Sequence, residues 1–134
     1  KFAKYSAASD FISKMPEGYD TVVGERGVGL SGGQKQRISL ARALAVRPSI
    51  LILDDTTSAV DMETEKQIQE ALRHLDFSCT KVIIAQRIST TMMADKILVM
   101  QHGRITEMGN HEELMAKGGF YQNLYNSQFV KVSE

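Results

Sequence analysis

Residues 50–55 constrain the fold of this chain more than any other stretch. Four consecutive apolar residues, Ile50 to Leu53, are followed by two acids, Asp54 and Asp55. An apolar run of this length is typical of a strand that is buried on both faces of a parallel sheet. The run at residues 81–85 has the same character, so two buried strands are predicted.

The stretch between these two runs is amphipathic. A helix is predicted over residues 63–75, because its apolar residues recur at helical spacing and form one stripe that can pack on a sheet. The residues of this stripe are Ile68, Ala71, Leu72 and Leu75. The order strand, helix, strand predicts a right-handed βαβ unit and places the chain in the α/β class.

Two further helices are predicted before this unit. Residues 1–14 are rich in alanine and form a helical pattern that the turn at Pro16 stops. Residues 34–46 contain neither glycine nor proline and form a second amphipathic pattern, which Pro48 ends. A glycine-rich loop at residues 24–29 lies between the two helices.

The C-terminal part of the chain reads as a hairpin followed by two helices. A strand at residues 96–100 precedes the turn pair His102-Gly103, so residues 104–108 are predicted to pair back with it. Asn110 and Glu113 have the spacing of a capping box for the next helix, which the glycines at 118 and 119 end. Residues 120–128 form a last helix, and the residues after it are expected to fray.

Charge and composition argue against nucleic-acid binding, a disulfide and a membrane span. Sixteen Lys and Arg balance sixteen Asp and Glu, which argues against general nucleic-acid binding. The basic stretch with Lys35, Arg37, Arg42 and Arg47 is better explained as a solvated helix face than as a polyanion site. Cys79 is the only cysteine, so no intrachain disulfide can form. The apolar runs are too short to span a membrane. Lys1 is not an initiator Met, so the chain is expected to be part of a longer one.

Ser31, Gly32 and Gly33 open the predicted helix at residues 34–46. The start of a helix presents unpaired N–H groups and partial positive charge, and glycines let the backbone approach a ligand closely, which together suits a phosphate group. A flexible turn that merely caps the helix is the alternative. These three residues alone favour that plainer interpretation.

Asp54 and Asp55 leave the buried strand at its C-terminal end, where open α/β sheets bind their ligands. In P-loop ATPases, the first of two such acids holds Mg²⁺ and the second orients the attacking water. The alternative is a pair of acids that caps a loop. The other motifs of the chain decide between these possibilities.

Taken together, the motifs resemble the ATPase domain of the ABC transporter family from about residue 7 to residue 128. Residues 30–34 match the signature LSGGQ, and residues 36–37 and 41–44 match the helix that follows it. Asp54 matches the Walker B aspartate, residues 58–61 match the D-loop, and residues 109–114 match the usual G-T-H-E-E-L. Residues 21–27 resemble the loop by which ABC exporters contact their membrane domain.

The resemblance implies a role for each site residue. Asp54 would bind Mg²⁺, and Asp55 would stand in the position of the catalytic acid. Because two such domains meet head to tail in this family, the signature would cover ATP held by a second nucleotide-binding domain, and Asp61 would act across the dimer. The signature residues concerned are Ser31, Gly32, Gly33 and Gln34. Residues 1–47 would belong to the helical subdomain, and residues 48–134 to the C-terminal part of the ATPase core.

The chain departs from the family pattern in three ways. No stretch matches the phosphate-binding loop G-x-x-x-x-G-K-[ST], which lies upstream in the family. Asp55 replaces a glutamate, which withdraws the carboxylate by about 1.5 Å, and displacements near that size can cost about a hundredfold in rate. Gln86 stands at the position of the switch histidine and can donate a hydrogen bond but cannot become a cation. The last two departures resemble the degenerate site of heterodimeric multidrug ABC exporters.

The resemblance therefore implies one subunit of a heterodimeric ABC exporter, with its ATPase domain at the cytoplasmic face of the cell membrane. Its own site would hydrolyse ATP poorly, while its signature would complete the active site of the partner. The membrane domain would belong to the same polypeptide, and no nucleic acid would be bound. Two alternatives stay open: a regulatory ABC-like module that binds nucleotide without transport, and a homodimeric exporter that tolerates Asp55 and Gln86.

Overall fold

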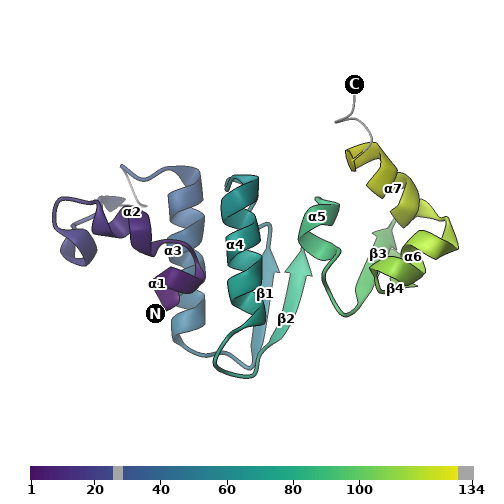
Figure 1. Ribbon diagram of the computed structural model, residues 1–134, viewed down its shortest axis with the longest axis horizontal. Coiled ribbons are helices and arrows are strands. Elements are labelled where there is room, and N and C mark those ends of the chain that lie inside the picture. Colours follow the sequence, from purple (N-terminus) through teal and green to yellow (C-terminus); the bar gives the residue numbers. More distant parts are fainter. Residues whose placement is uncertain (26–28, 130–134) are drawn as a thin grey trace. The chain divides into compact units, whose positions relative to one another are not determined.

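The computed structural model describes residues 1–25 and 29–129, which form helices and two small sheets (Figure 1). The chain divides into two compact units, Lys1–Ile84 and Ala85–Glu134. Each unit has a hydrophobic core of its own. The α/β class predicted from the sequence is confirmed. In the described ranges, no helix is long and apolar enough to cross a membrane.

The first unit is built around a parallel pair of strands. β1 (Ile50–Asp54) pairs with β2 (Thr80–Ile84) in parallel, so that Ile50 lies opposite Thr80 and Asp54 opposite Ile84. α4 (Met62–Arg73) connects the two strands along the chain, and α3 (Gly32–Ala45) precedes them. The predicted strand–helix–strand order and the parallel pairing are confirmed.

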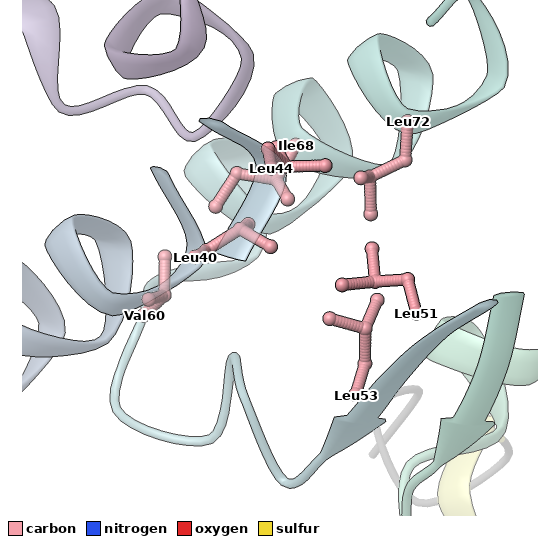
Figure 2. Close-up of a cluster of buried hydrophobic side chains, with 7 residues drawn as sticks. All are labelled: Leu40, Leu44, Leu51, Leu53, Val60, Ile68 and Leu72. Atoms are coloured by element: carbon pink, nitrogen blue, oxygen red, sulfur yellow. The ribbon is translucent and has the colours of Figure 1, made fainter. Parts of the chain in front are cut away.

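The core of this unit lies between the two long helices and β1 (Figure 2). Leucines of α3 and β1 meet Ile68 and Leu72 of α4, and Val60 joins them from the segment before α4. Ile68 is 1% exposed and Leu72 is 5% exposed, and burying each of them contributes about 1.5–3 kcal/mol. The apolar stripe predicted for this helix therefore packs as expected.

The strands are not buried on both faces, which corrects the expectation from the continuous apolar run. Along β1, Leu51 and Leu53 are buried, whereas Ile50 and Ile52 are 64% and 65% exposed. Neighbouring residues of a strand point to opposite faces, and here the helices cover only one of them. In the described part of the chain, the second face of the β1–β2 pair remains exposed.

The N-terminal helix is broken in two, so the prediction of one helix over residues 1–14 is wrong. α1 (Phe2–Tyr5) and α2 (Ser9–Ser13) are separated by Ala7, whose φ of 55° lies in the left-handed region. The Ala7 carbonyl accepts a hydrogen bond of 2.9 Å from Nη1 of Arg37. This contact with α3 stabilises a break that local helix propensity alone disfavours. A short 3₁₀ turn, η1 (Gly18–Asp20), follows α2.

The second unit consists of a hairpin and three helices. α5 (Ile88–Thr91) leads to β3 (Ile97–Gln101) and β4 (Arg104–Gly109), which pair antiparallel with an irregularity between Val99 and Met100. His102 and Gly103 both have positive φ, 49° and 74°, as the two-residue hairpin turn requires. The predicted hairpin is therefore confirmed.

The last two helices are α6 (His111–Lys117) and α7 (Phe120–Phe129). Asn110 and Glu113 form the predicted capping box at the start of α6, and Gly118 ends it in the left-handed conformation. The fraying predicted for the final residues falls outside the described ranges. The proposed division into residues 1–47 and 48–134 is one of functional subdomains, and it stays a prediction.

Candidate functional site

The turn before α3 is built as a helix start with free amides. Ser31 is the N-cap: its Oγ accepts the N–H of Gln34 at 3.2 Å, and the N–H of Ser31 donates to Gln34 Oε1 at 2.9 Å. Among the described residues, the N–H groups of Gly32 and Gly33 have no acceptor. Two free amides at a helix N-terminus suit a phosphate group. Gln34, predicted as a ligand-binding residue, thus also has a structural role in the capping box.

Gly33 lies against the backbone of the segment that connects β1 to α4. A Cβ atom at this position would approach the carbonyl oxygen of Ala59 to 2.7 Å. The backbone would have to move to accept any side chain there. A glycine is therefore required by close packing within this chain, a reason that the sequence did not reveal.

Asp54 and Asp55 lie at the carboxyl end of β1, as predicted, and both are exposed. Asp55 has a φ of 50°, a left-handed conformation that aspartate tolerates better than most residues. Its N–H donates to the carbonyl oxygen of Ile84 at 3.1 Å, which extends the contact with β2 beyond the last paired residues. The chain therefore turns sharply at this acid.

Residues 55–61, which we name the acid loop, carry Asp55 at one end and Asp61 at the other. Asp61 caps α4: its Oδ1 accepts the N–H of Thr64 at 2.9 Å and its Oδ2 accepts the hydroxyl of Thr64 at 2.7 Å. These hydrogen bonds to backbone and side chain lower the pKa of the Asp61 carboxyl. Asp61 is thus held as a carboxylate at the surface, where its proposed role across a dimer would require it.

Two side chains outside the predicted site hold the acid loop. Gln36 of α3 hydrogen-bonds to the loop at three atoms. From α4, the buried carboxylate of Glu65 accepts the hydroxyl of Thr57 at 2.9 Å. From the sequence, Gln36 is predicted only as part of a helix that matches the family, and no role is predicted for Glu65. A glutamate on the inner face of α4, four residues after the Asp61 cap, was the signal for the latter.

Gln86 belongs to the second unit, where Gln128 of α7 holds its backbone. Nε2 of Gln128 donates to the Gln86 carbonyl at 2.9 Å, and the N–H of Ile88 donates to Gln128 Oε1 at 2.9 Å. The Gln86 side chain is exposed. Gln128 was not predicted as a site residue, because a single sequence does not reveal contacts between residues 42 positions apart.

The carboxylates at the end of β1 suit Mg²⁺ only together with the phosphate oxygens of a nucleotide. No cluster of three or more His, Cys, Asp or Glu able to hold a metal occurs in ranges 1–25 and 29–129. Mg²⁺ usually takes one or two carboxylates together with phosphate oxygens and water. Asp54, exposed at the end of β1, can supply one such carboxylate.

Comparison with known proteins identifies the family of this arrangement. The family model described as ABC transporter matches residues 3–58. The chain is 57% identical over 130 residues to the uncharacterized ABC transporter ATP-binding protein YknU of Bacillus subtilis. It is 56% identical over 126 residues to a Staphylococcus aureus protein that is named for multidrug export as an ATP-binding/permease protein.

These matches cover 97% and 94% of this chain but 22% of the length of either relative. A solved structure, described as a bacterial Atm1-family ABC exporter with ATP bound, superposes with a TM-score of 0.90 at 44% identity. That superposition covers 96% of this chain and 23% of the exporter chain. The chain thus belongs to the ABC transporter family and corresponds to part of its ATP-binding domain, homologous to ABC exporter ATP-binding/permease proteins.

Proposed function

We propose that this chain supplies part of the ATPase domain of an ABC exporter at the cytoplasmic face of the cell membrane. The observation that carries the proposal is its 44% identity and TM-score of 0.90 to a bacterial exporter with ATP bound. The membrane domain would belong to the same polypeptide, and the substrate would be ATP with Mg²⁺. ATP-driven association of two such domains would move the membrane domain between its conformations.

Each site residue has a proposed role. Asp54 would bind Mg²⁺, which lowers the negative charge of the phosphates when it is present. Asp55 would orient the attacking water, and Gln86 would donate a hydrogen bond to the γ-phosphate. Gly32 and Gly33 would present their free N–H groups, with the Ser31 hydroxyl, to the nucleotide of a second domain. Asp61 would contact that second domain.

The same residues support an unequal pair of ATP sites. Asp55 is shorter than the glutamate usual in the family, and Gln86 cannot become charged, so hydrolysis at this chain's own site would be slow. The signature turn, which we define as Ser31, Gly32 and Gly33, keeps the Ser31 cap, and among the described residues its two glycine N–H groups have no acceptor. The partner in the dimer would therefore be a different subunit whose site this chain completes.

The test restores the usual residues at both positions. In the complete transporter, Asp55→Glu with Gln86→His should raise turnover at this site by about 10–100-fold, because positioning and proton transfer are restored. Hydrolysis is measured separately for the two sites, and Gln67→His on the exposed face of α4 serves as the control. Unchanged turnover at this site in the double variant would contradict the proposal of a degenerate site.

A further inference from the structure

Gln36 connects α3, the helix that begins in the signature, to the acid loop through both the oxygen and the nitrogen of its side-chain amide. Its Oε1 accepts the N–H of Ala59 at 3.0 Å. Its Nε2 donates to the carbonyl oxygen of Asp55 at 3.2 Å and to Oγ of Ser58 at 3.0 Å. One side chain of α3 thus holds three residues of the loop, 19 to 23 positions further along the chain.

The chemistry of these contacts requires an amide. The oxygen faces a donor and the nitrogen faces an acceptor, and glutamine is the side chain of this length that offers both. A glutamate in the same place could still accept the Ala59 N–H. However, its second oxygen would face the Asp55 carbonyl, where two acceptors repel each other and the present hydrogen bond is lost. It could accept the Ser58 hydroxyl only if that hydroxyl gave up its own bond to the Asp55 carbonyl at 3.2 Å.

Packing restricts the same loop. Gly33, one turn before Gln36, lies so close to the Ala59 carbonyl that no side chain fits between them. Val60 is 7% exposed and belongs to the core cluster with Leu40 of α3 (Figure 2). The first turns of α3 and the acid loop therefore contact each other through hydrogen bonds and through close packing. A shift of one requires a shift of the other.

We propose that Gln36 is a positioning residue that couples the signature turn to the backbone of Asp55 and to the D-loop residues Ser58 and Ala59. The proposal rests on the function proposed above, in which the signature turn faces the ATP of a second domain. Contact of Gly32 and Gly33 with that ATP would then fix the acid loop of this chain through Gln36. The two ATP sites of the dimer would thereby be linked within one chain.

The experiment compares Gln36→Ala and Gln36→Glu with Gln67→Ala in the complete transporter. Gln67 is an exposed glutamine of α4, so its loss controls for removal of a helical amide. We expect both Gln36 variants to lower the transporter's kcat for ATP by about tenfold or more. The reason is that Ser31, Gly32 and Gly33, which would complete the partner's active site, lose the support of the acid loop, and misplacement near 1 Å can cost about a hundredfold. The KM for ATP should stay within about twofold, because the Gln36 side chain contacts the acid loop and is not among the groups proposed to hold ATP.

A second measurement follows the loop itself. Amide hydrogen exchange of residues 55–60 should accelerate in both Gln36 variants and stay unchanged in Gln67→Ala, whether or not ATP is hydrolysed. Wild-type exchange at this loop in Gln36→Glu, or a wild-type kcat in either variant, overturns the coupling. A wild-type transporter that hydrolyses no ATP overturns the proposed function and the coupling together. These two failures are therefore distinguishable.

Discussion

At the scale of single residues, Gly33 has two independent reasons to be glycine. Its free N–H is part of the proposed phosphate contact, and its α-carbon packs against the Ala59 carbonyl at a distance that excludes a Cβ. The first reason concerns the partner's ATP, and the second concerns this chain alone. A substitution at Gly33 therefore acts on both the signature turn and the acid loop.

Because of this double role, we expect ATPase activity to be more sensitive to a substitution at Gly33 than to one at Asp55. Gly33→Asp should almost abolish ATPase activity of the complete transporter, because it adds bulk against Ala59 and negative charge beside a phosphate. Asp55→Asn should reduce total activity only modestly, since its own site would contribute little. Steady-state ATPase assays of both variants test the difference. Equal damage from the two substitutions would mean that the two sites contribute equally.

The sequence predicts which residues belong to the site better than it predicts the contacts that these residues make. Asp54, Asp55 and Ser31 follow from the order of motifs, because each occupies a position where a strand ends or a helix begins. Gln36 was predicted only as part of a matching helix, although it makes three hydrogen bonds to the acid loop. An amide on a half-exposed helix face looks the same in a sequence whether it contacts water or a loop.

At the scale of elements, the capped helices follow the sequence closely and the N-terminal helix does not. α3 and α6 begin at capping boxes whose residues lie within one turn, so a local pattern specifies them. The break at Ala7 depends on Arg37, 30 positions away. Gly119 depends on a distant residue in the same way. It follows the end of α6, as predicted, but a Cβ there would also overlap the Glu107 carboxylate, which accepts the N–H groups of Phe120 and Tyr121 at the start of α7.

The contact between α6 and α7 should depend on pH in the alkaline range. Tyr121 is 3% exposed, and its hydroxyl lies 2.8 Å from Nδ1 of His111. Burial, together with the nearby Tyr125, raises the pKa of Tyr121 above its ordinary value of 10.0. The protonated phenol is therefore favoured in the folded state. Its contribution to stability is full below pH 10.0 and is lost as the pH rises through the raised pKa.

Amide exchange of α7 between neutral and strongly alkaline pH measures this effect, after correction for the intrinsic pH dependence of exchange. Protection should fall above pH 10.0 in the wild type, and Tyr121→Phe should remove that extra loss. Tyr19 is 65% exposed, so Tyr19→Phe is the matched control and should behave like the wild type. An alkaline loss of protection that persists in Tyr121→Phe would assign it to another group.

At the scale of the whole chain, the P-loop motif is missing from all 134 residues. That loop cradles the β- and γ-phosphates in this class of ATPase, and the free amides of Gly32 and Gly33 are proposed to face a different nucleotide. The isolated chain should therefore bind Mg-ATP very weakly. Calorimetric titration provides the measurement, and a dissociation constant in the micromolar range would contradict the expectation.

The class of the fold was predictable because strand, helix and strand follow one another without interruption, and local patterns specify each of them. The degree of burial was not. A continuous apolar run indicates burial on both faces, yet Ile50 and Ile52 are exposed in the described chain. The apolar pattern indicates which faces of a strand are suited to burial, whereas the structure shows which faces other residues of this chain cover.

The exposed face of the β1–β2 pair affects how this polypeptide would behave outside a larger assembly. Ile50, Ile52, Val82 and Ile84 form rows of branched apolar side chains on two neighbouring strands. Exposed apolar sheet faces promote face-to-face association of chains and precipitation. Overproduced alone, the chain would tend to accumulate in inclusion bodies. Lysine in place of Ile52 would act as a gatekeeper that keeps it in solution during purification.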